Sequence, residues 1–155
     1  MTTVENQIQT YELVLHFKRP LYNDMHIVKQ PCDVIKCLRQ YIAPERISYK
    51  EFFWVILLTR AHSIIGISEV ASGTTDCVSV SIKEIAQLAL LSNCSSVVIA
   101  HNHPSGKLQS SESDRKITQR ISKALKLFDI QLIDHIIITQ ESSYSLYDNG
   151  DFNHS

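Results

Sequence analysis

The apolar run at residues 96–100 (SVVIA) constrains the fold more than any other segment of the chain. A short strand without charged positions is typical of the interior of a sheet, where both faces are covered. Further strands are predicted at residues 51–59, 64–71, 131–139 and 144–147, and helices with an apolar stripe at about 82–91 and 111–128. This order predicts an α/β (α+β) fold in which one mixed central β-sheet is packed by helices.

Residues 1–47 are predicted to form a strand and a helix that extend this domain. Residues 11–18 (YELVLHFK) alternate as a strand does, and residues 20–23 indicate a turn. A helix is expected from about Pro31 to Ala43, because the residue before Pro44 disfavours helical geometry. The main domain is then expected at 48–148, with a loop at 73–76, and the tail at 149–155 is expected to be frayed.

Several features favour a cytoplasmic protein that does not enter a membrane. No apolar run approaches the ~20 residues of a membrane span, and the first residues lack the basic and apolar regions of a secretion signal. The spacing of Cys32, Cys37, Cys77 and Cys94 matches no zinc-ribbon or redox pattern. These cysteines are therefore expected to be small core residues.

The charge balance gives no support to nucleic-acid binding. The net charge is −1, from 15 basic and 16 acidic residues. Proteins that bind DNA or RNA usually carry a basic excess or stripe, because neutralising phosphates supplies most of their affinity. Here the basic residues are dispersed along the chain.

A candidate metal site follows the central apolar strand. His101 and His103 are two residues apart, so at the end of a strand they project from the same face. Pro104 ends the strand and Gly106 lets the chain turn, which brings the start of the next helix and its Asp114 back toward the histidines. Two imidazoles and a carboxylate are ligands that zinc favours, and three protein ligands leave a fourth position open, as in catalytic sites.

Two other interpretations remain open for these residues. Ser111-x-x-Asp114 also fits a capping box, in which Asp114 would only satisfy backbone donors of the helix. A histidine pair can also be a polar surface feature. His135, inside an apolar strand, is expected to be a buried core group or a group behind a metal ligand. The side chain of Asn102 is expected to point away from the metal and brace the loop.

The segment His101-Asn-His-Pro-Ser-Gly106, followed by Ser111-x-x-Asp114, resembles the metal-binding signature of the JAMM (MPN+/JAB) metalloprotease superfamily. More narrowly, it is similar to the RadC-like branch, whose hallmark is HNHPSG followed by PS-x-x-D. The likeness covers roughly residues 51–147. It implies a single JAB/MPN-like (cytidine-deaminase-like) domain.

The sequence departs from this pattern in two places. Ser110 stands where the family usually has proline, which is expected to loosen the loop without removing a ligand. Longer RadC proteins begin with a helix-hairpin-helix segment associated with DNA, and residues 1–50 contain no such glycine-centred hairpin.

The resemblance also implies a role for each site residue. His101, His103 and Asp114 would hold one Zn²⁺ per chain. Glu51 would act through the metal-bound water as general base and then as proton donor, and Ser111 would stabilise the oxyanion. Glu69, near the end of the next strand, is a competing candidate for the catalytic glutamate.

These roles predict a zinc-dependent hydrolase of the metallopeptidase or isopeptidase type, acting on a peptide or protein. Two alternatives remain. One is a RadC-like protein of DNA repair that acts on or with nucleic acid, and the other is a non-catalytic MPN-type scaffold for protein contacts. The sequence does not indicate the oligomeric state or the identity of the substrate.

Overall fold

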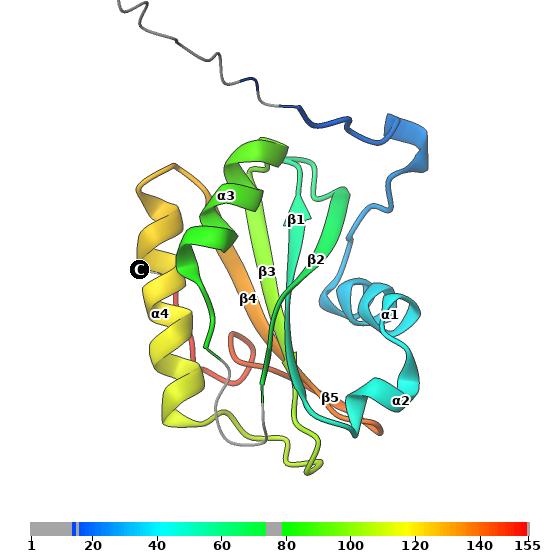
Figure 1. The fold of residues 1–155 in the computed structure, drawn as a ribbon, viewed down its shortest axis with the longest axis vertical. Helices are drawn as coiled ribbons and strands as arrows, with labels where there is room; N and C mark the ends of the chain where they lie inside the picture. Colours follow the sequence, from blue (N-terminus) through cyan, green and yellow to red (C-terminus); the bar gives the residue numbers. More distant parts are fainter. Residues whose placement is uncertain (1–13, 15, 74–78, 155) are drawn as a thin grey trace, which may run out of the picture.

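A five-stranded mixed sheet forms the centre of the molecule in the computed structural model, which describes residues 14, 16–73 and 79–154 (Figure 1). The strand order is β2-β1-β3-β4-β5. β3 is antiparallel to β1 and parallel to β4, so the predicted mixed sheet with the SVVIA segment at its centre is confirmed. The strands are β1 (Glu51–Leu58), β2 (Ile64–Gly73), β3 (Ser96–Asn102), β4 (Gln131–Ile138) and β5 (Ser143–Ser145).

Helices cover both faces of this sheet (Figure 1). α1 (Pro31–Tyr41) and α2 (Pro44–Ile47) pack on one face, and α3 (Ile82–Ser92) and α4 (Glu112–Lys126) pack on the other. A short 3-10 helix, η1 (Tyr22–Asp24), precedes α1. None of the helices among the described residues is long and apolar enough to cross a membrane.

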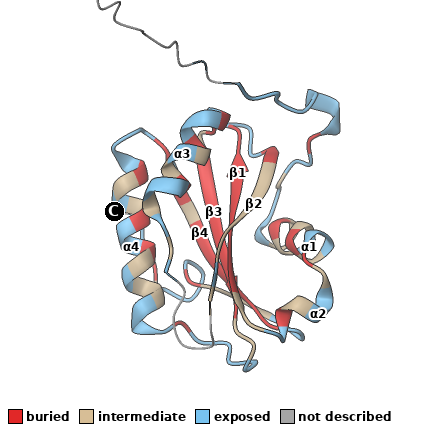
Figure 2. Cartoon of the chain, viewed as in Figure 1, coloured by how far each residue is buried: buried red, intermediate tan, exposed pale blue. Residues whose placement is uncertain are grey.

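The burial of β1 and β3 explains why their sequences lack polar alternation. Every residue of β3 is buried, and β1 is buried from Phe52 onward (Figure 2). Along β1, Trp54 joins the core under α1, whereas Phe53 and Val55 join the core under α3 and α4. Side chains alternate across a strand, so a strand covered on both faces is apolar throughout.

The prediction that the cysteines are small core residues is confirmed for Cys94, and Cys37 packs against the core under α1, whereas Cys32 belongs to neither core. Cys94 is buried in the core under α3, and burial raises the pKa of its thiol. Cys32 and Cys37 are half-buried, and all three are free thiols. Cys77 lies outside the described residues.

The predicted strand at residues 11–18 is wrong for the part that is described. Residues 11–13 and 15 lie outside the described residues, and residues 14 and 16–20 have no strand structure. Residues 16–20 lie away from the sheet in Figure 1. A strand needs a partner for its backbone groups, and among the described residues before α1 the isolated bridge to the edge of the sheet lies further along, between Ile27 and Ser63. The predicted loop at 73–76 is described only at Gly73, which ends β2.

The frayed tail predicted at 149–155 is wrong for Asp151 and Phe152. Phe152 is only 4% exposed and belongs to the core under α3 and α4. The backbone N–H groups of both residues donate to the Leu146 carbonyl, at 2.8 and 3.1 Å. The tail is polar apart from Phe152, and the burial of this one aromatic side chain holds the tail against the core.

Replacing Phe152 with alanine tests whether the tail is part of the folded domain. Removing a buried phenylalanine typically lowers the free energy of unfolding by about 3–5 kcal/mol. We expect a loss in this range for Phe152→Ala by urea denaturation. Asn153→Ala, at an exposed neighbouring position, is the matched control and should change little. Equal stability of the two variants would show that the tail is not anchored.

Candidate metal centre

His101 and His103 lie at the carboxyl end of β3, on the face covered by α4. His101 is 1% exposed and pairs with Phe53 across the β1–β3 ladder, so the two side chains share a face. Their rings stack with centroids 6.1 Å apart. His103 follows two residues later on the same side, and the two histidine ring centroids are 4.7 Å apart.

The turn after His103 fixes the orientation of its ring. Gly106 has φ +81°, a left-handed conformation that glycine adopts without strain, and its N–H donates to the His103 carbonyl at 3.0 Å. This turn brings the Lys107 carbonyl within 2.7 Å of His103 Nδ1. A carbonyl can only accept a hydrogen bond, so Nδ1 carries the proton and Nε2 faces the site.

Asp114 serves both as a helix cap and as a member of the site. Its Oδ2 accepts from the Ser111 N–H at 2.7 Å, and its own N–H donates to Ser111 Oγ at 3.0 Å, which completes the predicted capping box at the start of α4. Its Oδ1 lies 3.2 Å from His101 Nε2. The capping box is thus confirmed, and it does not exclude the metal-binding interpretation, because Oδ1 remains directed at His101.

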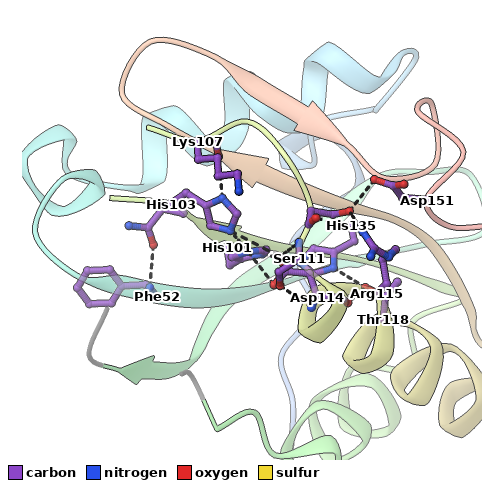
Figure 3. Close-up of polar contacts among 12 residues, drawn as sticks. Phe52, His101, His103, Lys107, Ser111, Asp114, Arg115, Thr118, His135 and Asp151 are labelled. Carbon is purple, nitrogen blue, oxygen red and sulfur yellow. Dashed lines mark hydrogen bonds and ion pairs between the residues drawn. The ribbon is translucent and has the colours of Figure 1, made fainter. Parts of the chain in front are cut away.

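The three side chains converge on one point (Figure 3). One ligand atom from each of His101, His103 and Asp114 lies within 4.8 Å of the other two. The two Nε2 atoms are only 2.8 Å apart. Two nitrogen lone pairs and a carboxylate at these distances repel one another unless a proton or a cation lies between them. Two imidazoles and one carboxylate, with an open side, form a donor set that suits Zn²⁺.

In the metal-free protein, the close approach of these groups also determines which of them is protonated. Burial opposes ionisation of Asp114, but hydrogen bonds from His101 and His103 hold the pKa of its carboxyl well below the usual range. Burial also opposes protonation of His103, but its contacts with Asp114 and the Lys107 carbonyl raise its pKa overall. Without metal, a proton on His103 therefore balances the carboxylate.

Glu51 lies at this site, whereas Glu69 faces the opposite side of the sheet. The β1–β3 register pairs Phe53 with His101, so continuing it by two residues places Glu51 opposite His103. The Glu51 charge contributes to the raised His103 pKa. Glu69 instead forms an ion pair with Arg46 at 2.8 Å, on the face covered by α2. Of the two glutamates, Glu51 is therefore the one that lies beside His101, His103 and Asp114.

A cavity of about 770 Å³ opens in front of these residues. Ser111 lines it, and its hydroxyl oxygen accepts from the Asp114 N–H. A hydroxyl that accepts this bond still has its own proton to donate to a group in the cavity. The lining also includes Glu51, Phe53, His103, Lys107, Asp114 and Arg120.

The loop before α4 is held firmly, and the expectation that Ser110 loosens it is wrong. Ser110 is buried, and its hydroxyl donates to Asp151 Oδ2 at 2.6 Å. Arg115 donates to both the hydroxyl and the carbonyl of Ser110, at 3.0 and 3.1 Å. Tyr144 donates to the same Asp151 oxygen at 2.7 Å. Hydrogen bonds thus supply the restraint that a proline ring would supply in the family pattern.

Asn102 points away from the His101–His103–Asp114 cluster, as the sequence predicts, but it braces the start of β1 and not the loop that follows β3. Its Oδ1 accepts from the Phe52 N–H at 2.7 Å, and its Nδ2 donates to the carbonyls of Ile47 and Lys50 at 2.8 and 2.7 Å. The residue between the two histidines therefore fixes the backbone on both sides of Glu51.

Two buried polar groups lie directly behind His101: His135, as the sequence predicts, and Thr118, which the sequence did not single out. His135 on β4 contacts His101, and Thr118 on α4 contacts His135. The only sequence signal for His135 was a histidine within an apolar strand, and Thr118 gave none.

Comparison with known proteins places the site inside a recognised family region. The family model of the RadC-like JAB domain matches residues 28–151. A UPF0758 protein of Aeromonas hydrophila subsp. hydrophila is 43% identical over 101 residues, which cover 65% of this chain and 45% of the relative. A UPF0758 protein of Vibrio cholerae serotype O1 is 42% identical over 100 residues, which cover 64% of this chain and 63% of the relative.

A third relative extends the match. A UPF0758 protein of Saccharophagus degradans is 36% identical over 114 residues, which cover 73% of this chain and 51% of the relative. The chain spans about half the length of the curated relatives it matches.

The raised His103 pKa predicts that, as the pH rises, the metal-free protein loses stability while its affinity for zinc increases. The folded chain holds more protons than the unfolded chain above about pH 6.5, so the stability that this proton provides is complete below that pH. It is lost as the pH rises through the raised His103 pKa. Zinc competes with the same proton, so zinc affinity rises over this range.

Thermal melts at about pH 6 and about pH 8 measure this difference. One series contains a chelator and the other contains excess zinc. The increase in Tm caused by zinc should be larger at the higher pH. An increase that is equal or smaller there would contradict the assignment of His103 as a zinc ligand.

Proposed function

The chain belongs to the RadC-like JAB domain family, and from this premise we propose that it is a zinc-dependent hydrolase of the metallopeptidase or isopeptidase type. The membership confirms the resemblance drawn from the HNHPSG segment, and the fold is the expected single JAB-like domain. The observation that carries the proposal is the convergence of His101, His103 and Asp114 beside Glu51 in one open cavity.

In this proposal, His101, His103 and Asp114 hold one zinc ion per chain. Zinc in such a site lowers the pKa of water toward ~7 and polarises a carbonyl. The contribution of the three side chains is to present two nitrogen lone pairs and a carboxylate oxygen from two rigid elements, the end of β3 and the first turn of α4. Such prior placement lowers the cost of assembling the site.

Glu51 moves the proton. It takes a proton from the attacking water and returns it to the leaving amine, so that one carboxylate serves both halves of the reaction. Its position at the first residue of β1 is fixed by the hydrogen bonds of Asn102 to the backbone of Lys50 and Phe52. The Glu69 carboxylate is not available for this role, because Arg46 holds it on the other face.

Ser111 binds the oxygen on which negative charge develops. Its hydroxyl oxygen accepts from the Asp114 N–H, so the remaining hydroxyl proton can be donated to the oxyanion. The capping bonds and the anchored Ser110 next to it keep this hydroxyl in place. Ser111 therefore caps α4 and serves the reaction at the same time.

A peptide or protein is the substrate we propose, and the cytoplasm is the location we propose. The cavity in front of the site is lined by both polar and apolar side chains, among them Phe53, Ile117 and several serines, which suits a peptide segment. The free thiols at Cys32, Cys37 and Cys94 agree with a reducing compartment.

A second candidate, action on a nucleic acid, is favoured by one observation. Lys107, Lys116 and Arg120 line the same cavity, and cations there suit an anionic substrate. Against it, Lys116 is already paired with Glu112 at 2.6 Å, and the net charge of the chain is −1. Anisotropy titrations with labelled single-stranded and duplex DNA at low salt distinguish the candidates, since micromolar, salt-sensitive binding would favour nucleic acid.

Two glutamate variants test the proposed mechanism. Zinc-loaded wild-type protein is assayed against libraries of internally quenched peptides and isopeptides. Glu51→Gln should retain zinc and lose at least about 100-fold in kcat, because removing a general base costs about 10²–10⁴-fold. Glu69→Gln is the matched control on the opposite face of the sheet and should keep wild-type activity.

The results of these assays test the role of Glu51 and the hydrolase activity separately. Full activity of Glu51→Gln, or loss of activity only in Glu69→Gln, would overturn the assignment of Glu51. A zinc-loaded wild-type protein that cleaves no peptide or isopeptide bond would contradict the proposed hydrolase.

A further inference from the structure

A buried hydrogen-bonded chain runs behind the metal site and connects two of its residues. His135 is fully buried on β4, and its Nε2 lies 2.7 Å from His101 Nδ1. Its other ring nitrogen, Nδ1, lies 2.6 Å from the hydroxyl oxygen of Thr118, which is also fully buried. The Thr118 hydroxyl in turn lies 2.6 Å from the main-chain carbonyl of Asp114. Figure 3 shows these residues behind His101 and Asp114.

The direction of each hydrogen bond in this series can be deduced from the Asp114 carbonyl, the acceptor at which the series ends. The Asp114 carbonyl can only accept, so the single hydroxyl proton of Thr118 is donated to it. Thr118 Oγ1 must then accept from His135, which places the ring proton of His135 on Nδ1. His135 Nε2 is consequently a bare acceptor, and His101 Nδ1–H donates to it.

This direction determines which nitrogen of His101 can face a metal. With its proton on Nδ1, the neutral His101 ring has its lone pair on Nε2, the atom that lies 2.8 Å from His103 Nε2 and 3.2 Å from Asp114 Oδ1. The opposite direction would put a proton on His101 Nε2 and block the site. The Lys107 carbonyl likewise keeps the proton of His103 on Nδ1, so that the lone pair of Nε2 faces the site.

We propose that Thr118 and His135 are positioning residues for the metal site, which fix the tautomer and the ring orientation of His101 so that its Nε2 can bind zinc. The inference rests on the proposed function, in which His101 is a zinc ligand. Phe53 supports the geometry, because its ring packs edge-on against His135 and stacks on His101. His135 is not itself a ligand, since its Nε2 is occupied by His101.

The series of hydrogen bonds from Asp114 to His101 also connects α4 and β3, the two elements that supply the proposed ligands. Thr118 is one turn after Asp114 on α4, His135 is on β4, and His101 is on the neighbouring parallel strand β3. A shift of α4 relative to the sheet would therefore break the Thr118–His135 bond as well as moving Asp114 away from His101. The two functions of holding α4 in place and orienting His101 use the same bonds.

A pair of substitutions at Thr118 separates positioning from packing. Thr118→Val keeps the shape of the side chain and removes the hydroxyl, whereas Thr118→Ser keeps the hydroxyl and removes a methyl group. Zn²⁺ alone is the probe, and its Kd is measured by competition with a chromophoric chelator. Loss of a hydrogen-bonding partner behind a ligand typically costs about 10–100-fold in metal affinity, so we expect a loss in that range for Thr118→Val and less than about threefold for Thr118→Ser.

Folded Thr118→Val protein that binds Zn²⁺ as tightly as wild type would overturn the proposal. If Thr118→Val does not fold, the wild-type protein decides, because long-range ¹H–¹⁵N spectra of the histidine rings report which nitrogen carries the proton. The Nδ1–H tautomer of His135 is expected, and a proton on His135 Nε2 would overturn the proposal. Wild-type protein that binds zinc but hydrolyses nothing would refute the hydrolase alone, and wild-type protein that does not bind zinc would refute both.

Discussion

The candidate metal centre depends on the close approach of three electron-pair donors, two from the end of β3 and one from α4. His101 Nε2 and His103 Nε2 are 2.8 Å apart, and Asp114 Oδ1 is 3.2 Å from the first of them. Such a group is stable only with a proton or a cation at its centre. The surrounding structure holds it together: β3 supplies the histidines, α4 supplies the carboxylate, and β1 places Glu51 beside them.

Much of this arrangement could be predicted from the sequence because it depends on local geometry. The alternation of a strand puts His101 and His103 on one face, a turn at Gly106 reverses the chain, and a helix N-terminus presents Asp114. The choice between a capping and a metal-binding role for Asp114 could not be made from the sequence. In the structure the capping bond uses Oδ2 and leaves Oδ1 directed at His101, so a capping role does not exclude metal binding.

What the sequence did not predict depends on contacts between distant segments. For His135 the sequence left a core group and a group behind a ligand as alternatives, and it is the parallel pairing of β3 with β4 that brings this residue behind the ring of His101, 34 residues earlier. Asp151 similarly reaches Ser110 across 41 residues because Phe152 is buried in the core. For that reason a serine in place of the family's proline was misread as a source of looseness, and a polar tail was misread as frayed.

A crystal structure of the zinc-soaked protein, with anomalous data collected on both sides of the zinc absorption edge, tests the central claim most directly. We expect one strong zinc peak per chain, bounded by His101 Nε2, His103 Nε2 and a carboxylate oxygen of Asp114, with its remaining side open to the cavity that Glu51 lines. A map without a peak at this position, or with zinc bound at the cysteines instead, would contradict it.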